Sequence, residues 1–205
     1  MVTTNLYITR HGKKVKEYEL QWTGQQDVPL SPKGFDQAKK LGKKLVKKQI
    51  EFSVVVSSPL QRARDTAHTI IEQFDVKPPL VLCDELIEMN HGEVDGLTEE
   101  EFHEKYPEMF AAWEHGEDPH FPGGENSADV AARTTPLINK LLQDHEGGNI
   151  LLVGHKSVNR VILGELMHIP KAFQYYLVLK ECKLSLYAVV DGEPKVKYIN
   201  CSSCV

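Results

Sequence analysis

Histidines and arginines that could handle a phosphoryl group follow three separate apolar segments of the chain. Arg10 and His11 come directly after the first segment, Arg62 comes shortly after the second, and His155 comes after the third. In an open α/β sheet, ligands bind at the carboxyl ends of the strands, so these positions are expected to converge. Two arginines and two histidines at one edge would form a positive pocket suited to a phosphate dianion.

Phosphoryl transfer needs an in-line nucleophile and cations around the equatorial oxygens, and neither requirement demands a metal. A neutral His11 imidazole would serve as the nucleophile, and Gly12 would let the backbone pass close to the ligand. Glu88 is the best candidate for protonating the leaving alkoxide, because it follows a strand-like segment in an apolar setting that would raise a carboxyl pKa. Taken alone, Glu88 could equally be an ordinary surface glutamate.

Apolar strand-like segments alternate with amphipathic helical segments along the chain, which is typical of an α/β fold. We expect strands over 5–9, 53–57, 81–83, 150–153, 184–190 and 195–199, the last two joined at Asp191-Gly192. We expect helices from Ser31 onward and over 60–74, 99–114, 127–145 and 157–167. The prediction is a three-layer α/β sandwich in which helices flank a mixed, largely parallel sheet.

Three local features refine this outline. The helix that begins near Ser31 is expected to bury Phe35, Ala38, Leu41 and Leu45. Pro136 must kink or shorten the helix over 127–145. A polar insertion over about 96–127, with a short helical part, is interpreted as a lid on a single domain that spans 1–205.

Composition excludes several classes of function. The chain has 205 residues, with 41% hydrophobic and 26% charged residues, as in an ordinary globular protein. A formal net charge of −5 argues against nucleic-acid binding. Without an apolar run of roughly 20 residues or a signal-like start, we expect no membrane contact and a cytoplasmic location. Cys83, Cys182, Cys201 and Cys204 are expected to be reduced thiols, with little prospect of a function for the terminal C-x-x-C.

An ordered set of motifs carries a resemblance to a known family. The motifs are Arg10-His11-Gly12, Ser57-Ser58-Pro59-Leu60-Gln61-Arg62, Glu88 before Gly92 and Gly96, Phe121-Pro122-Gly123-Gly124-Glu125, and Val153-Gly154-His155. Over nearly its whole length the chain resembles the histidine phosphatase superfamily, in its phosphoglycerate-mutase-like branch. The resemblance implies that His11 is phosphorylated, that Arg10, Arg62 and His155 hold the phosphate, and that Glu88 is the general acid and base. It implies no cofactor and no metal, and often a homodimer.

Departures from the family pattern bear on the reaction. Lys13, Lys14 and Glu17 stand where relatives place other residues, including an asparagine that touches the phosphate, and their roles stay open. Thr23-Gly24 resembles the substrate-binding turn of the mutases. However, the mutases carry an arginine shortly after the acid glutamate and basic residues in a longer lid, whereas the lid here is short and acidic. Hydrolysis is therefore favoured over mutase activity.

His91, three residues after Glu88, points to a substrate. The metal-independent phosphoserine phosphatases of the superfamily are similar in having a histidine there that contacts the amino-acid portion of the substrate. We therefore expect hydrolysis of a small phosphorylated metabolite, specifically O-phosphoserine, as in serine biosynthesis. His91 could also be a loop histidine bonded to the backbone. The alternatives are a phosphoglycerate mutase and a non-catalytic module that binds a phosphorylated ligand.

Overall fold

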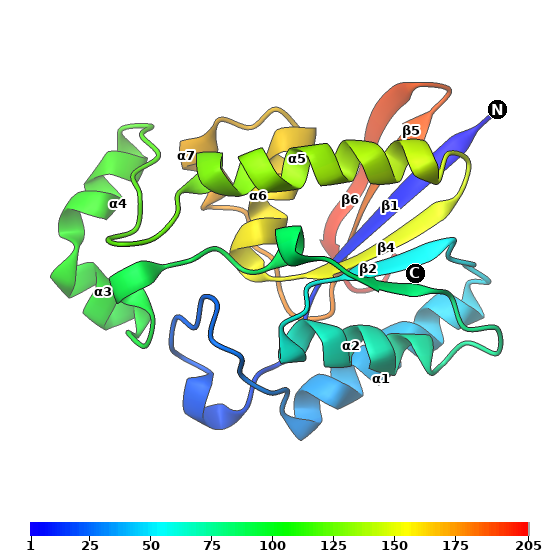
Figure 1. Ribbon diagram of the computed structural model, residues 1–205, viewed down its shortest axis with the longest axis horizontal. Helices are drawn as coiled ribbons and strands as arrows, with labels where there is room; N and C mark the ends of the chain where they lie inside the picture. The colour runs from blue at the N-terminus through cyan, green and yellow to red at the C-terminus, as the bar shows by residue number, and fades with distance from the viewer. Residues whose placement is uncertain (205) are drawn as a thin grey trace.

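A computed structural model describes residues 1–204 and shows, over that range, a six-stranded mixed sheet with helices on both sides (Figure 1). The strands are β1 (Thr3–Arg10), β2 (Val54–Ser57), β3 (Leu80–Leu82), β4 (Asn149–Gly154), β5 (Leu184–Val190) and β6 (Glu193–Cys201), in the order β3-β2-β4-β1-β5-β6. Strands β3, β2, β4 and β1 are parallel, and β5 and β6 are antiparallel additions. The predicted three-layer α/β fold with a largely parallel sheet is confirmed.

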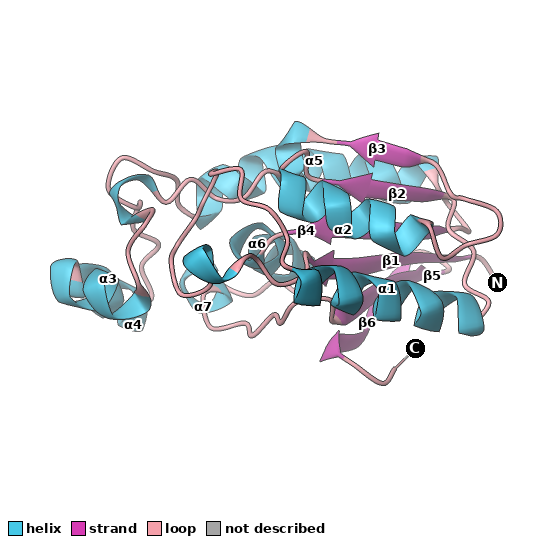
Figure 2. Cartoon of the chain, turned by 90° about the horizontal axis from the view of Figure 1, so that it is seen from below, coloured by secondary structure: helices cyan, strands magenta, loops and turns pink. Residues whose placement is uncertain are grey.

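Alternating side chains of the central strands build two cores, one on each face of the sheet. Leu6 and Ile8 of β1 face the helices α5 (Ser127–Asp144) and α6 (Lys156–Leu166), whereas Tyr7 faces α1 (Pro32–Lys47) and α2 (Gln61–Ile71). Figure 2 shows the sheet between these two helical layers. Because both faces are covered, the central strands consist almost entirely of buried residues, as in Val54 to Ser57.

Helix α1 begins as the sequence predicts but buries a different set of residues. The Ser31 side chain accepts a hydrogen bond from Gly34 N at the helix start, and Ala38, Leu41 and Leu45 are buried. Phe35, predicted to be buried, is 42% exposed. It lies about 100° around the helix from Gly34, the position that faces the protein interior. Gly34 is needed there because the backbone of Lys13 passes too close for a side chain.

Two prolines bear on the predicted helices. The helix predicted over 99–114 is two helices, α3 (Glu99–Lys105) and α4 (Pro107–Glu114), because Tyr106, which precedes a proline, has φ −133° and ψ 55°. Helix α5 runs from 127 to 144 through Pro136 and is not shortened. There the proline leaves a carbonyl one turn earlier without its helical partner, a local loss that the packing of the helix on the sheet tolerates.

The remaining connections are short. Residues 16–18, 84–86 and 92–94 form 3-10 turns, and α7 (Lys171–Gln174) follows α6. Asp191 and Gly192 join β5 to β6 as predicted, and both have positive φ, as a tight hairpin requires.

Two of the four cysteines differ from the prediction. Cys83 and Cys182 are free thiols, but Cys201 and Cys204 form a disulfide, with Cα atoms 5.8 Å apart. The expectation of four reduced thiols was therefore wrong for the terminal pair, which β6 and the following turn bring into bonding geometry. Across residues 1–204, no helix is both long and apolar enough to cross a membrane.

Candidate active site

The three phosphate-handling segments converge because β1, β4 and β2 are parallel neighbours in the sheet. Their carboxyl ends open onto a pocket of about 140 Å³. Its lining residues are Arg10, His11, Lys14, Glu19, Leu20, Gln21, Trp22, Thr23, Gly24, Arg62, Glu88, His91, Glu99, Lys156 and Ser157. The volume is below the roughly 300–1,000 Å³ of typical ligand pockets, so the site suits a compact ligand.

His11 is buried at the end of β1 with a fixed tautomer. Its Nδ1 lies 2.7 Å from Gly12 O, and because a carbonyl oxygen only accepts hydrogen bonds, Nδ1 must carry a hydrogen. Burial, followed by the charges of Arg62 and Arg10, holds the pKa of His11 well below its usual value of 6.5. The imidazole is therefore neutral at neutral pH, with the lone pair on Nε2, which is the form required of a nucleophile.

Arg62 enters the pocket from the first turn of α2. Its guanidinium donates to Gly24 O at 2.7 Å, to Gln26 O at 2.6 Å and to His155 Nδ1 at 3.1 Å. A guanidinium has five N–H groups, so these three bonds fix its plane and leave two N–H groups for a ligand. Arg62 is 1% exposed, and at this burial its charge favours an anionic ligand.

His155 lies behind Arg62 at the end of β4 and has both ring nitrogens engaged. Nδ1 accepts from Arg62 Nε, so Nε2 carries the hydrogen and donates to Ser58 Oγ at 2.8 Å. Burial and the charge of Arg62 hold the pKa of His155 well below its usual value, consistent with a neutral ring. The structure thus shows His155 orienting Arg62, and its direct contact with phosphate stays a prediction.

Arg10 and Lys14 add further positive charge to the pocket. Arg10 donates to Leu179 O at 3.1 Å and pairs with Glu181, and its buried Nε has no partner among residues 1–204. Lys14 Nζ donates to Gln21 O and to Thr23 Oγ1, each at 3.0 Å. Burial, followed by Arg62 and Arg10, lowers the pKa of Lys14 to about 8.

Glu88 is buried at the N-terminus of α6. Oε1 accepts from Met89 N and Val158 N, both at 2.9 Å, and Oε2 accepts from Ser157 N at 3.1 Å. Burial alone would raise the pKa of Glu88. The electrostatic effect of His91 and the hydrogen bonds from these backbone N–H groups act in the opposite direction and are larger together, so the pKa lies below its usual value. The prediction of a raised pKa was therefore wrong, because the sequence does not reveal the three donors.

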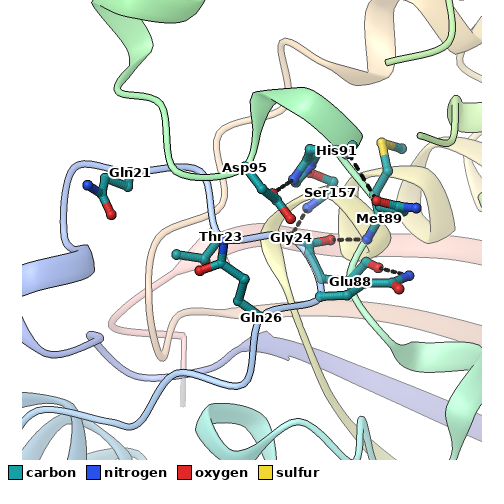
Figure 3. A network of polar contacts seen from close by, with 12 residues as sticks. Gln21, Thr23, Gly24, Gln26, Glu88, Met89, His91, Asp95 and Ser157 are labelled. Carbon is teal, nitrogen blue, oxygen red and sulfur yellow. Dashed lines mark hydrogen bonds and ion pairs between the residues drawn. The ribbon is translucent and has the colours of Figure 1, made fainter. Parts of the chain in front are cut away.

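His91 belongs to a chain of polar side chains beside Glu88. Its Nε2 lies 3.2 Å from Ser157 Oγ, and its Nδ1 lies 3.5 Å from Asp95 Oδ1. Figure 3 shows Asp95 and His91 facing each other, with Ser157 and Glu88 close by. The ring also packs edge-on against Trp22 and Phe121, with centroid distances of 4.7 and 4.8 Å. His91 is thus a wall residue of the pocket, engaged with side chains rather than with backbone.

The other residues named from the sequence fall into two groups. Thr23 and Gly24 line the pocket as expected. Their oxygens accept hydrogen bonds from two pocket cations, Thr23 Oγ1 from Lys14 and Gly24 O from Arg62. Gly12 was expected to let the backbone pass close to the ligand. The structure gives a different reason for a glycine at this position, because a Cβ there would meet Gly34 O of α1. Glu17 is exposed in the 3-10 turn and does not line the pocket.

The Phe121–Glu125 motif holds the loop that carries Glu88. Asn90 N donates to Glu125 Oε2, and Glu125 N donates to Asn90 O, both at 2.8 Å. Gly92 has φ +54°, and a side chain there would meet Pro122 O, so the two loops require a glycine at their crossing. This junction fixes the start of the insertion, 96–127, relative to the pocket.

Sequence reasoning missed Lys156 and Ser157, which line the pocket from the first turn of α6. Their signal was their position directly after His155, because the first residues of a helix at the carboxyl edge of a sheet face the ligand. Within the described part of the chain, no group of three or more His, Cys, Asp or Glu side chains is placed to hold a metal ion.

Comparison with known proteins places the chain in a family. A family model for the histidine phosphatase superfamily (branch 1) matches residues 6–202. The 2,3-bisphosphoglycerate-dependent phosphoglycerate mutase 2 of Gloeobacter violaceus is 34% identical over 168 residues, which cover 80% of the chain and 76% of that protein. Phosphoserine phosphatase 1 of Hydrogenobacter thermophilus is 32% identical over 165 residues, with coverages of 79% and 75%.

Solved structures agree with this placement. The mycobacterial glucosyl-3-phosphoglycerate phosphatase superposes with a TM-score of 0.80 at 26% identity, covering 97% of the chain and 99% of that structure. Other relatives are longer: a bifunctional protein of Mycobacterium tuberculosis is 30% identical over 200 residues, and the chain spans 54% of its length. The relatives thus include both phosphatases and a mutase.

Proposed function

The chain belongs to the histidine phosphatase superfamily (branch 1), and we propose that it hydrolyses a small phosphomonoester, O-phosphoserine, through a phosphohistidine at His11. The observation that carries the proposal is the tautomer of His11, whose Nδ1–H bond to Gly12 O leaves a lone pair on Nε2 in a pocket lined by Arg10, Arg62 and Glu88.

The first step of the proposed reaction transfers the phosphoryl group to His11. The Nε2 lone pair forms a bond to phosphorus while the bond from phosphorus to the leaving oxygen breaks. Arg10 and the two free N–H groups of Arg62 neutralise the equatorial oxygens, with His155 holding the plane of Arg62. Protonated Glu88 gives its proton to the leaving oxygen, so the alcohol departs neutral.

The second step regenerates the enzyme. Glu88, now a carboxylate, removes a proton from water, whose oxygen attacks phosphorus, and the P–N bond returns its electrons to His11 Nε2. Because the backbone donors favour the Glu88 carboxylate in the free enzyme, the proton for the first step must arrive with the substrate. A bound phosphate dianion also raises the affinity of Glu88 for a proton by charge repulsion.

The walls of the pocket support hydrolysis rather than a mutase reaction. A mutase must retain a bisphosphate intermediate, which calls for cations in the lid. Among the lining residues, the insertion 96–127 contributes Glu99, an anion. We propose that this insertion acts as a lid and that His91 faces the amino-acid portion of O-phosphoserine together with Ser157.

One observation favours the alternative, a phosphoglycerate mutase. Lys14 and Lys156 both line the pocket and add charge beyond what a single phosphate needs. The Gloeobacter relative bears that name.

A substrate panel in the presence of EDTA tests the proposal. The compounds are O-phosphoserine, 3-phosphoglycerate and an aryl phosphate, and the measurements are phosphate release and isomerisation. We expect fastest release from O-phosphoserine and no loss of rate with the chelator, since the site supplies its own cations. Isomerisation of 3-phosphoglycerate with negligible phosphate release would establish the mutase instead. Absence of turnover with every compound would favour a non-catalytic binding module.

The pH dependence follows from the groups in the pocket. We expect kcat/KM to rise as the pH is lowered from about 8 to about 6, because Glu88 needs a proton and Lys14 and Lys156, with pKa values of about 8, gain charge. His11 stays neutral over this range because its pKa is held well below 6.5. Initial rates across the range provide the measurement. A decline of kcat/KM on acidification through pH 6.5 would contradict the low pKa of His11.

A further inference from the structure

Lys156 is a pocket cation that neither step of the proposed reaction uses. It is the first residue of α6, next to His155, and its ammonium lies 5.2 Å from the centre of the Trp22 ring. Burial, with a smaller effect of Arg160, lowers the pKa of Lys156 to about 8, which leaves the ammonium the favoured form at neutral pH. The charge is thus kept in the pocket at a cost in solvation.

No hydrogen-bond acceptor and no carboxylate within ion-pair distance satisfies this ammonium in the part of the chain that the structure describes. The other pocket cations all have protein partners: Arg10 pairs with Glu181, Lys14 donates to Thr23 Oγ1, and Arg62 donates to Gly24 O. A half-buried charge without a protein partner is explained if a ligand supplies the counter-charge.

Lys14 and Lys156 have different neighbours in the pocket. Lys14 Nζ donates to Gln21 O and Thr23 Oγ1, and after burial the charges of Arg62 and Arg10, which face the scissile phosphate in the proposed reaction, lower its pKa to about 8. Lys156 Nζ lies over the Trp22 ring, which packs edge-on against His91, the residue assigned above to the part of the substrate that leaves. We therefore assign Lys156 to the leaving part of the substrate as well.

The ammonium is also held in place before a ligand binds. Its platform, Trp22, is 8% exposed, packs against His91 and Phe121, and exchanges backbone hydrogen bonds with Gly96 and Leu97 of the insertion. A cation fixed over a rigid ring loses little conformational entropy when it binds an anion.

From this placement we propose that Lys156 binds a carboxylate on the leaving alcohol and so restricts the enzyme to compact phosphomonoesters that carry one. A single ammonium matches the single charge of a carboxylate. A second phosphate is disfavoured, because Glu88 and Glu99 line the same small pocket and would repel a dianion more strongly. This inference rests on the proposed function and specifies its substrate class.

The test compares substrates that differ in the carboxylate. 3-Phosphoglycerate carries a carboxylate where glycerol 3-phosphate carries a hydroxymethyl group. O-Phosphoserine carries a carboxylate where O-phosphoethanolamine carries a hydrogen. In Lys156→Gln, we expect kcat/KM for the two carboxylates to fall about 10- to 100-fold, as for the loss of a charge-assisted hydrogen bond. The values for the two compounds without a carboxylate should stay within about threefold, and Lys156→Arg should recover part of the loss.

Two control variants separate this contact from general electrostatics and from folding. Lys140→Gln removes an exposed lysine that pairs with Asp144 on α5 and should change none of the four values. Lys14→Gln should lower all four together, since Lys14 lies with the phosphate-facing arginines. Thermal unfolding of each variant reports on folding.

Three results would overturn the inference. An equal fall for all four compounds in Lys156→Gln would place Lys156 at the phosphate, and no change would remove it from recognition. A selective loss for 2,3-bisphosphoglycerate would assign it to a second phosphate. If the wild type releases phosphate from none of the compounds, the proposed function fails. Calorimetric binding of 3-phosphoglycerate and glycerol 3-phosphate to the wild type and to Lys156→Gln then still shows whether Lys156 binds the carboxylate.

Discussion

The variant His11→Ala is expected to lose at least about 10⁴-fold in kcat, because no other group can take over the attack on phosphorus. Arg62 and His155 hold each other without His11, so the phosphate-binding part of the site should survive the substitution. KM should therefore change far less than kcat. Steady-state phosphate release with O-phosphoserine and with an aryl phosphate gives both constants.

His68→Ala is the matched control for this variant. His68 is exposed on α2, so its removal takes away a histidine without touching the pocket. It should retain full activity. A His11→Ala enzyme that turned over within tenfold of the wild-type rate, with an unchanged unfolding temperature, would show that the phosphoryl group does not pass through His11.

The second large effect is expected for Glu88→Gln and should depend on the leaving group. With an alkyl phosphate such as O-phosphoserine, the variant cannot protonate the departing oxygen, and kcat/KM, which reports the first step, should fall by about 10²- to 10⁴-fold. With 4-nitrophenyl phosphate the leaving group is stable as an anion, so the first step should be slowed much less. The ratio of the two losses is the measurement, because a general disturbance of the pocket would lower both rates alike.

Glu85→Gln controls for the loss of a carboxylate from the same loop. Glu85 is exposed, and its side chain accepts a hydrogen bond from Cys83, away from the pocket. Glu88→Gln also replaces the acceptor of Ser157 N with an amide, so Glu88→Ala should be measured beside it. Equal losses of kcat/KM with both substrates in both Glu88 variants would argue against protonation of the leaving group by Glu88.

The positions that converge could be predicted because local signals fix the strands that carry them. Val54 to Val56 and Ile150 to Val153 are uninterrupted apolar segments, typical of strands buried on both faces, and such strands run parallel with their carboxyl ends at one edge. His11 and His155 follow from that topology alone. The same reasoning could not show that His155 contacts Arg62, since this depends on side chains 93 residues apart.

The electrostatics of Glu88 could not be read from the sequence for a related reason. The apolar neighbours Leu86, Ile87 and Met89 suggested desolvation, and burial does act in that direction. The effect of burial is reversed by His91 and by the backbone N–H groups of Ser157, Val158 and Met89. The positions of Ser157 N and Val158 N depend on where α6 begins relative to the loop. Because every residue except proline has a backbone N–H, the residue types do not indicate which of these groups donate to Glu88.

Phe35 and Gly34 show the same limit in packing. Hydrophobicity favoured burial of Phe35, but at the inward-facing position, Gly34, the backbone of Lys13 lies so close that only a glycine fits. Lys156 shows the same limit of sequence-based prediction at the active site. A lysine at the start of a helix is usually solvated, and only the pocket around it shows that its charge is retained among aromatic and polar walls.

Acid-free quenching of the enzyme during turnover of ³²P-labelled substrate tests the central claim most directly. Within the first turnover, one labelled phosphoryl group per molecule should appear on the peptide that contains His11, and it should be stable to base and labile to acid, as a phosphoramidate bond is. The label should decay as phosphate is released and should be absent from His11→Ala. Label on another residue, or phosphate release without any labelled enzyme at catalytic rates, would contradict the mechanism.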